Sequence, residues 1–374
     1  MRMIRVFLIL TAVLCLLTTC CDECKDCPVC PEPEDIKYRL YAVDDNGHRL
    51  YAIDIPADTV LFSIPIDYTV RSMFVSQDGS RLMVGAIELL TTLVYDTRDL
   101  SVKDTLDNML GYYYCDYSDD YVALVSTLSA DLDFKILDPT SLLPRMTIER
   151  AMRTSFLDTV SNCLYGVAGG AAELANIIYK IDCNTGQLAD SFIIKTNGDQ
   201  SVLVSDLAYN WLNDILYFHA KISYWEGWFY QYDLHADSVI DSTYLVDQFG
   251  SSAISPDGRK IYMTETGNAW FFVSPPGYIR IYDAFTHEVT DYIYHPDTDP
   301  YGQQWEPLYR DILIMPDGKR AYIGAGGNAA TWAPLAIYSI DLEQNTIKVG
   351  AMPTPTFSAS VIAIGPVPTQ KEEE

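Results

Sequence analysis

The sequence predicts an all-β fold in which a unit of four short strands occurs seven times. The first observation is an aspartate that ends a short apolar run. It recurs at Asp54, Asp96, Asp138, Asp182, Asp233, Asp283 and Asp341. The intervals are 42, 42, 44, 51, 50 and 58 residues, a period typical of repeat architectures with room for four strands per unit. We therefore expect a seven-bladed β-propeller of four-stranded antiparallel blades over residues 38–366.

A tight turn between the first two strands of a unit is the second observation. Gly79, Gly258 and Gly318 each follow an aspartate and precede a run of alternating apolar and polar residues. Glycine provides the positive φ that such turns need, and the alternation is typical of half-buried strands. Units three to five have other residues at this place, namely 118–120, 160–162 and 212–214.

The third observation concerns the two ends of the repeat array. The first unit has only three predicted strands, at 38–44, 48–55 and 59–65, and an apolar run at 359–364 follows the last unit. We expect this run to complete the first blade as its innermost strand. Such closure of the ring removes exposed sheet edges.

The repeat has a recognisable form at residues 255–265, S-P-D-G-R-K-I-Y-M-T-E. This run resembles the repeat of YVTN-type seven-bladed β-propellers, in the quinoprotein-dehydrogenase-like and WD40-like group. The resemblance extends over residues 38–366 and implies the fold, but not a function, because these propellers host unrelated activities. Some relatives bind a quinone cofactor or open lactone rings, and no residue set of this chain can be carried over from them. We predict no cofactor and no metal site.

The N-terminus predicts export. Arg2 and Arg5 precede an apolar run at 6–17, which is long enough for a signal peptide and too short to span a bilayer. The following Leu-Thr-Thr-Cys resembles a bacterial lipobox, although Thr stands where Gly, Ala or Ser is usual. Residues 1–20 are interpreted as a lipoprotein-type signal peptide with lipidation at Cys20, or alternatively Cys21. The chain would be lipid-anchored in a bacterial cell envelope; a plain secretory signal is the alternative.

Residues 21–37 predict a Cys/Pro-rich tether. Four cysteines there read C-x-x-C-x-x-C-x-x-C before a proline. The last gap is one residue shorter than in the bacterial ferredoxin motif, so an oxidised or lipidated tether is favoured over an iron–sulfur or zinc site. Prolines stiffen such a segment. At the other end, residues 367–374 predict an acidic disordered tail.

Charge excludes one class of partner. The chain has 25 basic and 51 acidic residues, for a net charge of −26. Such a surface repels the phosphate backbone, which excludes nucleic acid, and suits anionic lipid headgroups poorly. The repeated aspartates are interpreted as hairpin caps rather than as catalytic or metal-binding groups. A weak calcium site in the acidic loops stays open, as does the oligomeric state.

The tryptophans indicate where a ligand could bind. Long loops are expected near 168–176, 219–228, 266–278, 294–310 and 324–334, all on one face of the propeller. Five of six tryptophans fall in them: Trp225, Trp228, Trp270, Trp305 and Trp332. Exposed aromatic rings can stack on sugars or grip an extended peptide, and Glu226 and Gln304 could add polar contacts. Alternatively, the rings pack together to hold the loops.

The main hypothesis is a non-enzymatic binding platform for a glycan, a peptide or an envelope protein. The alternative is a lactonase, lyase or glycan-cleaving enzyme at the same face. His219, expected to begin a loop, would be its best acid/base candidate, although a lone histidine there is more often a hydrogen-bonded loop residue. No catalytic motif is present. A third interpretation is a structural subunit with a self-complementary apolar patch.

Cys163 and Cys183 flank a predicted hairpin and would lie nearly opposite each other. In an exported protein this arrangement predicts a cross-strand disulfide, with two buried thiols as the alternative.

Overall fold

The computed structural model divides the chain into two compact units, Met1–Lys37 and Tyr38–Glu374, and every strand it describes lies in the second. The structure describes residues 36–44, 48–55, 57–86, 88–89, 91–107, 115–117, 122–125, 134–138, 140–148, 152–158, 162–168, 177–194, 203–210, 212–221, 227–236, 238–245, 248–266, 278–294, 308–326, 336–348 and 359–368.

The strands in these residues form four-stranded antiparallel sheets in which neighbours along the chain are paired. Their bounds, sheet by sheet, are β4 (Val70–Val75), β5 (Arg81–Ala86), β6 (Thr91–Asp96) and β7 (Val102–Asp107); β8 (Cys115–Tyr117), β9 (Val122–Val125), β10 (Phe134–Leu137) and β11 (Pro144–Ile148); β12 (Met152–Asp158), β13 (Cys163–Ala168), β14 (Ile177–Asp182) and β15 (Leu188–Ile193); β16 (Leu203–Asn210), β17 (Ile215–Lys221), β18 (Gly227–Asp233) and β19 (Ser238–Leu245); β20 (Gln248–Ile254), β21 (Lys260–Thr266), β22 (Tyr278–Asp283) and β23 (Val289–Tyr294); β24 (Leu308–Ile314), β25 (Arg320–Gly326), β26 (Ala336–Asp341) and β27 (Thr346–Lys348).

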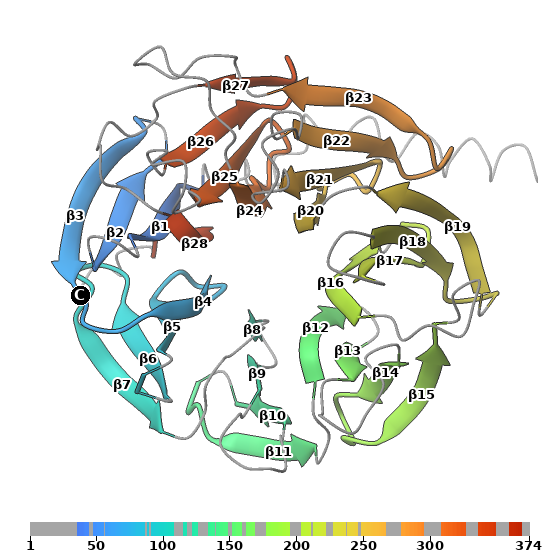
Figure 1. Cartoon of the computed structure of the whole chain (residues 1–374). Helices are drawn as coiled ribbons and strands as arrows, with labels where there is room; N and C mark the ends of the chain where they lie inside the picture. Colours follow the sequence, from blue (N-terminus) through green and yellow to red (C-terminus); the bar gives the residue numbers. More distant parts are fainter. Residues whose placement is uncertain are drawn as a thin grey trace, which may run out of the picture. The chain divides into compact units, whose positions relative to one another are not determined.

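One further sheet combines the two ends of the array. Its order is β28-β1-β2-β3, with β1 (Tyr38–Asp44), β2 (Arg49–Asp54), β3 (Thr59–Pro65) and β28 (Ala359–Pro366). The apolar run expected at 359–364 is therefore a strand, and it pairs antiparallel with β1. In Figure 1 the innermost strand of each sheet is the first of its strands along the chain, except in the combined sheet, where it is β28, and the strand at the other end of the sheet order lies at the rim. The fold is a β-propeller with four-stranded antiparallel blades, as predicted.

Apolar side chains fill the space between neighbouring blades. Side chains alternate along a strand, so both faces of β1 are used. Leu40 and Ala42 pack in one cluster with Tyr322 of β25, whereas Tyr41 and Val43 pack in another with residues of β5. Burial on both faces explains why the inner strands read as nearly continuous apolar runs.

The repeated aspartates cap the hairpins to the outer strands, as the sequence predicts. In all seven units the carboxylate accepts a hydrogen bond from a backbone N–H two or three residues later. The donors are Ala57, Arg98, Thr140, Asn184, His235, Phe285 and Glu343. Hydrogen bonds to a carboxylate favour its charged form, and the pKa of Asp138 falls to about 2, chiefly through the N–H of Ser141.

The inner turns also match the prediction where they are described. Gly79, Gly258 and Gly318 have φ values of 69°, 68° and 68°. In the fourth and fifth units the left-handed residues are Asn162 and Asp214, with φ values of 52° and 55°. Asparagine and aspartate tolerate this region better than other side chains, which explains how those units turn without glycine. Residues 118–120 lie outside the described ranges.

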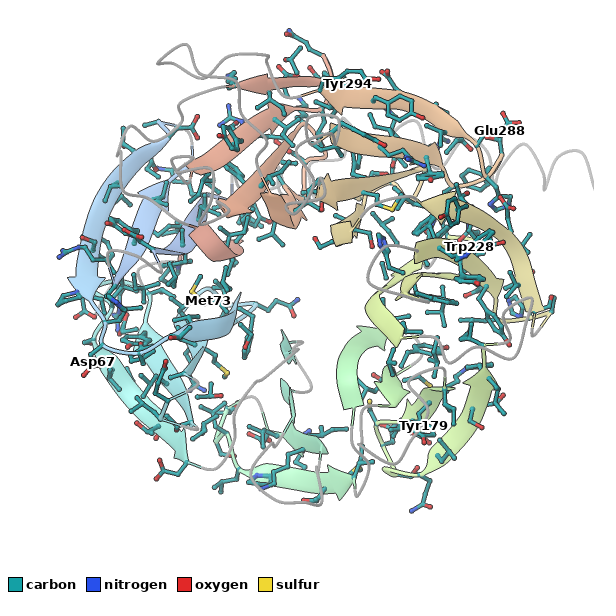
Figure 2. The ribbon with its side chains drawn as sticks, in the orientation of Figure 1. Asp67, Met73, Tyr179, Trp228, Glu288 and Tyr294 are labelled. Carbon is teal, nitrogen blue, oxygen red and sulfur yellow. The ribbon has the colours of Figure 1, made fainter. Side chains whose placement is uncertain are left out.

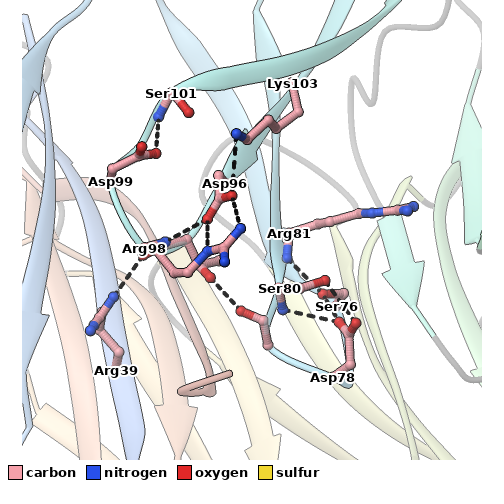
Figure 3. A network of polar contacts seen from close by, with 12 residues as sticks. Arg39, Ser76, Asp78, Ser80, Arg81, Asp96, Arg98, Asp99, Ser101 and Lys103 are labelled. Atoms are coloured by element: carbon pink, nitrogen blue, oxygen red, sulfur yellow. Dashed lines mark hydrogen bonds and ion pairs between the residues drawn. The ribbon is translucent and has the colours of Figure 1, made fainter. Parts of the chain in front are cut away.

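Close packing joins β28 to the blade of β4–β7. A Cβ added to Gly365 would lie 2.2 Å from Cγ1 of Val75, and one added to Gly79 would lie 2.0 Å from the carbonyl oxygen of Pro366. Next to this contact, Arg39 of β1 donates from Nη1 to the carbonyl oxygen of Thr97 at 2.6 Å. Figure 3 shows the surrounding polar network of the β4–β7 blade. Gly79 is thus required both for its positive φ and for the approach of the Pro366 backbone, whereas Gly365 is required for the close approach of the Val75 side chain.

Four of the outer strands share a structural feature at the edge of their sheet, a bulge followed by an aspartate. β7, β15, β19 and β23 each contain a bulge opposite the third strand. Just after it, an aspartate accepts a hydrogen bond from the next backbone N–H. The aspartates are Asp104, Asp190, Asp241 and Asp291. The aspartate thus provides this N–H with an acceptor on its own strand. Bulges and charged side chains on an edge strand hinder the addition of another strand.

Candidate ligand-binding site

Most of the predicted site residues fall outside the described ranges. These are Trp225, Glu226, Trp270, Gln304, Trp305 and Trp332. The proposed lipidation residues, Cys20 and Cys21, do so as well. Their roles stay predictions. Two of the predicted ligand-binding residues, His219 and Trp228, lie in the described residues.

The expectation that His219 begins a loop is wrong. Strand β17 runs on to Lys221, and the side chain of His219 has 0% exposure. It lies opposite Phe229 of β18 and meets that ring edge-on, with the ring centroids 5.3 Å apart. A side chain with no exposed surface cannot exchange a proton with a ligand on the loop face, so this histidine gives the enzyme alternative no support.

Trp228 is the second residue of β18 and not a loop residue. It pairs with Tyr244 of β19, and the two rings meet edge-on at 5.2 Å, while Tyr230 lies 6.4 Å away. The indole is half-buried against the core between two blades. For this tryptophan the packing interpretation applies, although part of the ring remains at the surface beside Tyr244, which is 45% exposed.

The predicted disulfide is wrong. Cys163 lies opposite Asp182, so Cys183 is offset by one residue. Because neighbouring side chains point to opposite faces of a sheet, the two sulfurs are on different sides. Cys163 packs in the cluster toward the β16–β19 blade, and Cys183 packs in the cluster with Ile136 of β10. Both are buried thiols.

A group of exposed tyrosines on the β20–β23 blade was not predicted. Tyr278 of β22 lies opposite Tyr294 of β23, and Arg280 lies opposite Tyr292. Tyr294 is 61% exposed and Tyr292 37%. The ring centroids of Tyr292 and Tyr294 are 5.9 Å apart with the planes at 25°. Tyr278 is 5.5 Å from Tyr292 and 6.1 Å from Tyr294. We call Tyr278, Arg280, Tyr292 and Tyr294 the tyrosine shelf.

Arg280 organises the tyrosine shelf. Its guanidinium carbon lies 5.8 Å from the ring centroid of Tyr278 and 5.9 Å from that of Tyr292, which is cation–π distance. It also donates from Nη2 to the hydroxyl of Tyr278 at 3.1 Å and from Nη1 to that of Tyr282 at 3.2 Å. Tyr282 is buried, so the arginine links the exposed rings to the blade interior.

The exposed aromatic residues lie at the end of the blades from which the predicted loops leave. Strand β22 starts at Tyr278, directly after residues 267–277, which contain Trp270; β23 ends at Tyr294, directly before residues 295–307, which contain Trp305. Trp228 and Tyr244 have the same places in the β16–β19 blade. Figure 2 shows Trp228 and Tyr294 on neighbouring blades. We call Trp228 and Tyr244, together with the tyrosine shelf, the aromatic rim.

The sequence contained a signal for the tyrosine shelf. The run Tyr-Ile-Arg-Ile-Tyr at 278–282 alternates with period two, which places the tyrosines and the arginine on one face. Periodicity alone does not tell an exposed outer face from one buried between blades, so this run did not stand out as a site.

The described part of the chain contains neither a metal-binding group of side chains nor a membrane-spanning helix. No group of three or more His, Cys, Asp or Glu residues there could hold a metal ion. No helix among those residues has the length and apolar character needed to cross a bilayer.

The sequence matches no family model and no curated protein sequence. Solved structures do match. A functionally unknown protein from Desulfotomaculum acetoxidans has a TM-score of 0.62 at 12% identity, covering 87% of this chain and 98% of that one. Kuenenia stuttgartiensis hydrazine synthase has a TM-score of 0.58 at 15% identity, covering 75% and 79%. The dihydro-heme d1 dehydrogenase NirN, in complex with DHE, has 0.56 at 12%, covering 88% and 75%. At such identities the likeness shows the fold alone.

Proposed function

We propose that this chain is a non-enzymatic binding protein of the bacterial cell envelope, which holds a glycan, a peptide or a partner protein on the loop-bearing end of its propeller. The aromatic rim is the observation that carries the proposal. Large rings kept partly exposed at this end of two neighbouring blades are what a stacking or gripping surface requires. The segments that contain Trp270 and Trp305 directly adjoin strands β22 and β23 in the chain.

The scaffold we propose is a closed ring of seven blades of the YVTN type. The support is that β28 pairs with β1 and also contacts β4 and β24 of the blades on either side. A ring joined in this way positions its loops more rigidly than an open row of sheets, and rigid support lowers the entropic cost of binding.

We also propose that residues 1–20 are a lipoprotein-type signal peptide and that Cys20 carries the lipid. The charge and apolar pattern of that segment supports this. Metabolic labelling with an alkyne fatty acid tests it: Cys20→Ala should abolish labelling and Cys21→Ala should not. The reverse outcome would assign the lipid to Cys21, and labelling of neither wild type nor variants would end the proposal.

The binding function is tested with the full chain, purified in mild detergent and applied to glycan and peptide arrays. A variant with Trp225, Trp270 and Trp305 replaced by Ala should lose binding. The matched control is Phe285→Ala, which removes a 53% exposed ring from the turn between β22 and β23, at the other end of the blade. Equal binding by wild type, the triple variant and the control would refute the proposed site.

A further inference from the structure

We propose that the tyrosine shelf is a carbohydrate subsite that takes the apolar face of a neutral sugar chain. This inference rests on the proposed binding function and narrows its ligand class at one blade. Three steps carry it: the arrangement of the rings, the position of Arg280, and the exclusion of other ligands.

The first step is the arrangement of the tyrosine rings at the surface. Tyr292 and Tyr294 project from the same face of β23, and their planes lie within 25° of each other at a centroid separation of 5.9 Å. Tyr278 borders both, and Tyr294 is 61% exposed. Because these two rings stack on each other, the more exposed ring, Tyr294, is the one that would pack against the apolar face of a pyranose unit. Tyrosine combines an apolar ring face with a polar hydroxyl, which suits the alternation of C–H and O–H groups on a sugar.

Arg280 adds hydrogen-bond donors and a positive charge to the tyrosine shelf. Its Nη atoms donate to the hydroxyls of Tyr278 and Tyr282. These two hydrogen bonds hold the guanidinium beside the ring of Tyr278. The cation between the rings also occupies the place that a ligand ammonium would take in an aromatic cage, so a cationic ligand is disfavoured.

The edge of the same strand disfavours a peptide bound by strand addition, because one of its backbone N–H groups already has an acceptor. The backbone N–H of Tyr292 donates to the carboxylate of Asp291 at 2.8 Å. On the neighbouring blade, the N–H of Ser242 donates likewise to Asp241. An extended peptide needs these edge groups for its main-chain hydrogen bonds. A sugar that stacks on the sheet face does not.

Charge then separates neutral from acidic sugars. The chain carries a net charge of −26, and the one cation of the shelf, Arg280, is already engaged by two tyrosine hydroxyls and two tyrosine rings. Repulsion from this field disfavours uronate-containing or sulfated chains. A neutral glycan has no such penalty.

Affinity electrophoresis of the full chain in detergent tests the inference. Native gels contain one polysaccharide each: neutral xyloglucan, mannan, β-glucan and dextran, and acidic polygalacturonate. At least one neutral gel should retard the protein, and polygalacturonate should not. Tyr294→Ala should weaken the apparent affinity about tenfold, the size expected when one stacked ring is lost. Tyr294→Phe should retain most of the binding because the ring remains.

The control for the shelf is Phe285→Ala, which removes a 53% exposed ring from the turn between β22 and β23, at the other end of the same blade; it should bind within twofold of wild type. Thermal melting of each variant checks the fold, which should be unaffected because Tyr294 is mostly exposed. If neutral polysaccharide binding were lost in the triple tryptophan variant but kept in a Tyr292→Ala/Tyr294→Ala variant, the shelf would be overturned while the proposed function stood. Retardation by polygalacturonate alone, or by none of the polysaccharides, would also overturn the subsite.

Discussion

The contact between the C-terminal strand and the β4–β7 blade can be isolated with one substitution made in three equivalent turns. Gly79, Gly258 and Gly318 share a φ near 68°, so an alanine at any of them meets the same backbone strain, of about 1–2 kcal/mol. What differs is the neighbour of the added methyl. At Gly318 it would be Cδ of Pro256 at 3.5 Å, an ordinary contact.

The other two turns are tighter. At Gly258 the methyl would lie 2.8 Å from Oδ1 of Asn210, a side-chain atom that can move only if the Asn210 amide weakens its hydrogen bonds to Leu212 and Gly258. At Gly79 it would lie 2.0 Å from the backbone oxygen of Pro366, which moves only with β28. Overpacking a well-packed site costs about 1–3 kcal/mol. Gly79→Ala should therefore lose about 2–5 kcal/mol in total, Gly318→Ala only the strain, and Gly258→Ala an intermediate amount.

Calorimetric melting and urea unfolding of the three variants measure this order. In a large domain each kcal/mol corresponds to a Tm change of about 2–4 °C, so Gly79→Ala should melt several degrees below Gly318→Ala. Limited proteolysis should also cut at 359–368 earlier in Gly79→Ala. Equal losses in all three variants would mean that the C-terminal strand does not contribute to the stability of that blade, and the reasoning would be refuted.

Three other contacts of the described residues can be tested in the same way. Without reductant, Cys163 and Cys183 should both be alkylated in the unfolded protein, and a disulfide-linked peptide pair would contradict their placement on opposite sheet faces. The pKa of Asp138 is lowered to about 2, so its contribution to stability is present above the ordinary aspartate pKa of about 4 and is lost as the pH falls toward 2. Asp138→Asn should thus reduce stability at pH 7 and lessen its fall in acid; an unchanged unfolding profile from pH 7 to pH 2 would count against the cap. Trp228→Ala should lower the free energy of unfolding by about 2–4 kcal/mol in urea titrations, since the indole packs on Tyr244, and a change below 0.5 kcal/mol, about the size of a surface substitution, would argue that the ring is not part of the core.

Local hydrogen bonding made much of the fold predictable. The repeated aspartates cap hairpins by bonds that span two or three residues, and Gly79 and its equivalents have the φ that their turns require. Such features depend only on the nearby sequence. The strand at 359–364 was predictable by counting strands, because the first unit lacked a fourth strand and this apolar run belonged to no other unit.

The errors arose where a single residue of register or strand length decides the outcome. Cys163 is opposite Asp182 and not Cys183, and a one-residue offset moves a side chain to the other face. His219 is a buried strand residue because β17 continues to Lys221, three residues farther than expected. The tyrosine shelf was missed for a related reason: alternation assigns Tyr278 and Arg280 to one face, but only the packing of the whole blade determines how much of that face is accessible.

The bonds from Asp104, Asp190, Asp241 and Asp291 to the next backbone N–H have a consequence for many copies held together. In the proposed anchored state, copies would crowd in two dimensions and meet side by side at their circumference. Each collision would bring outermost strands together. Since one backbone amide on each of these strands already has an acceptor, a colliding copy finds fewer groups with which to pair, and the exposed carboxylates repel it. Crowded copies should consequently resist edge-to-edge association through these four strands.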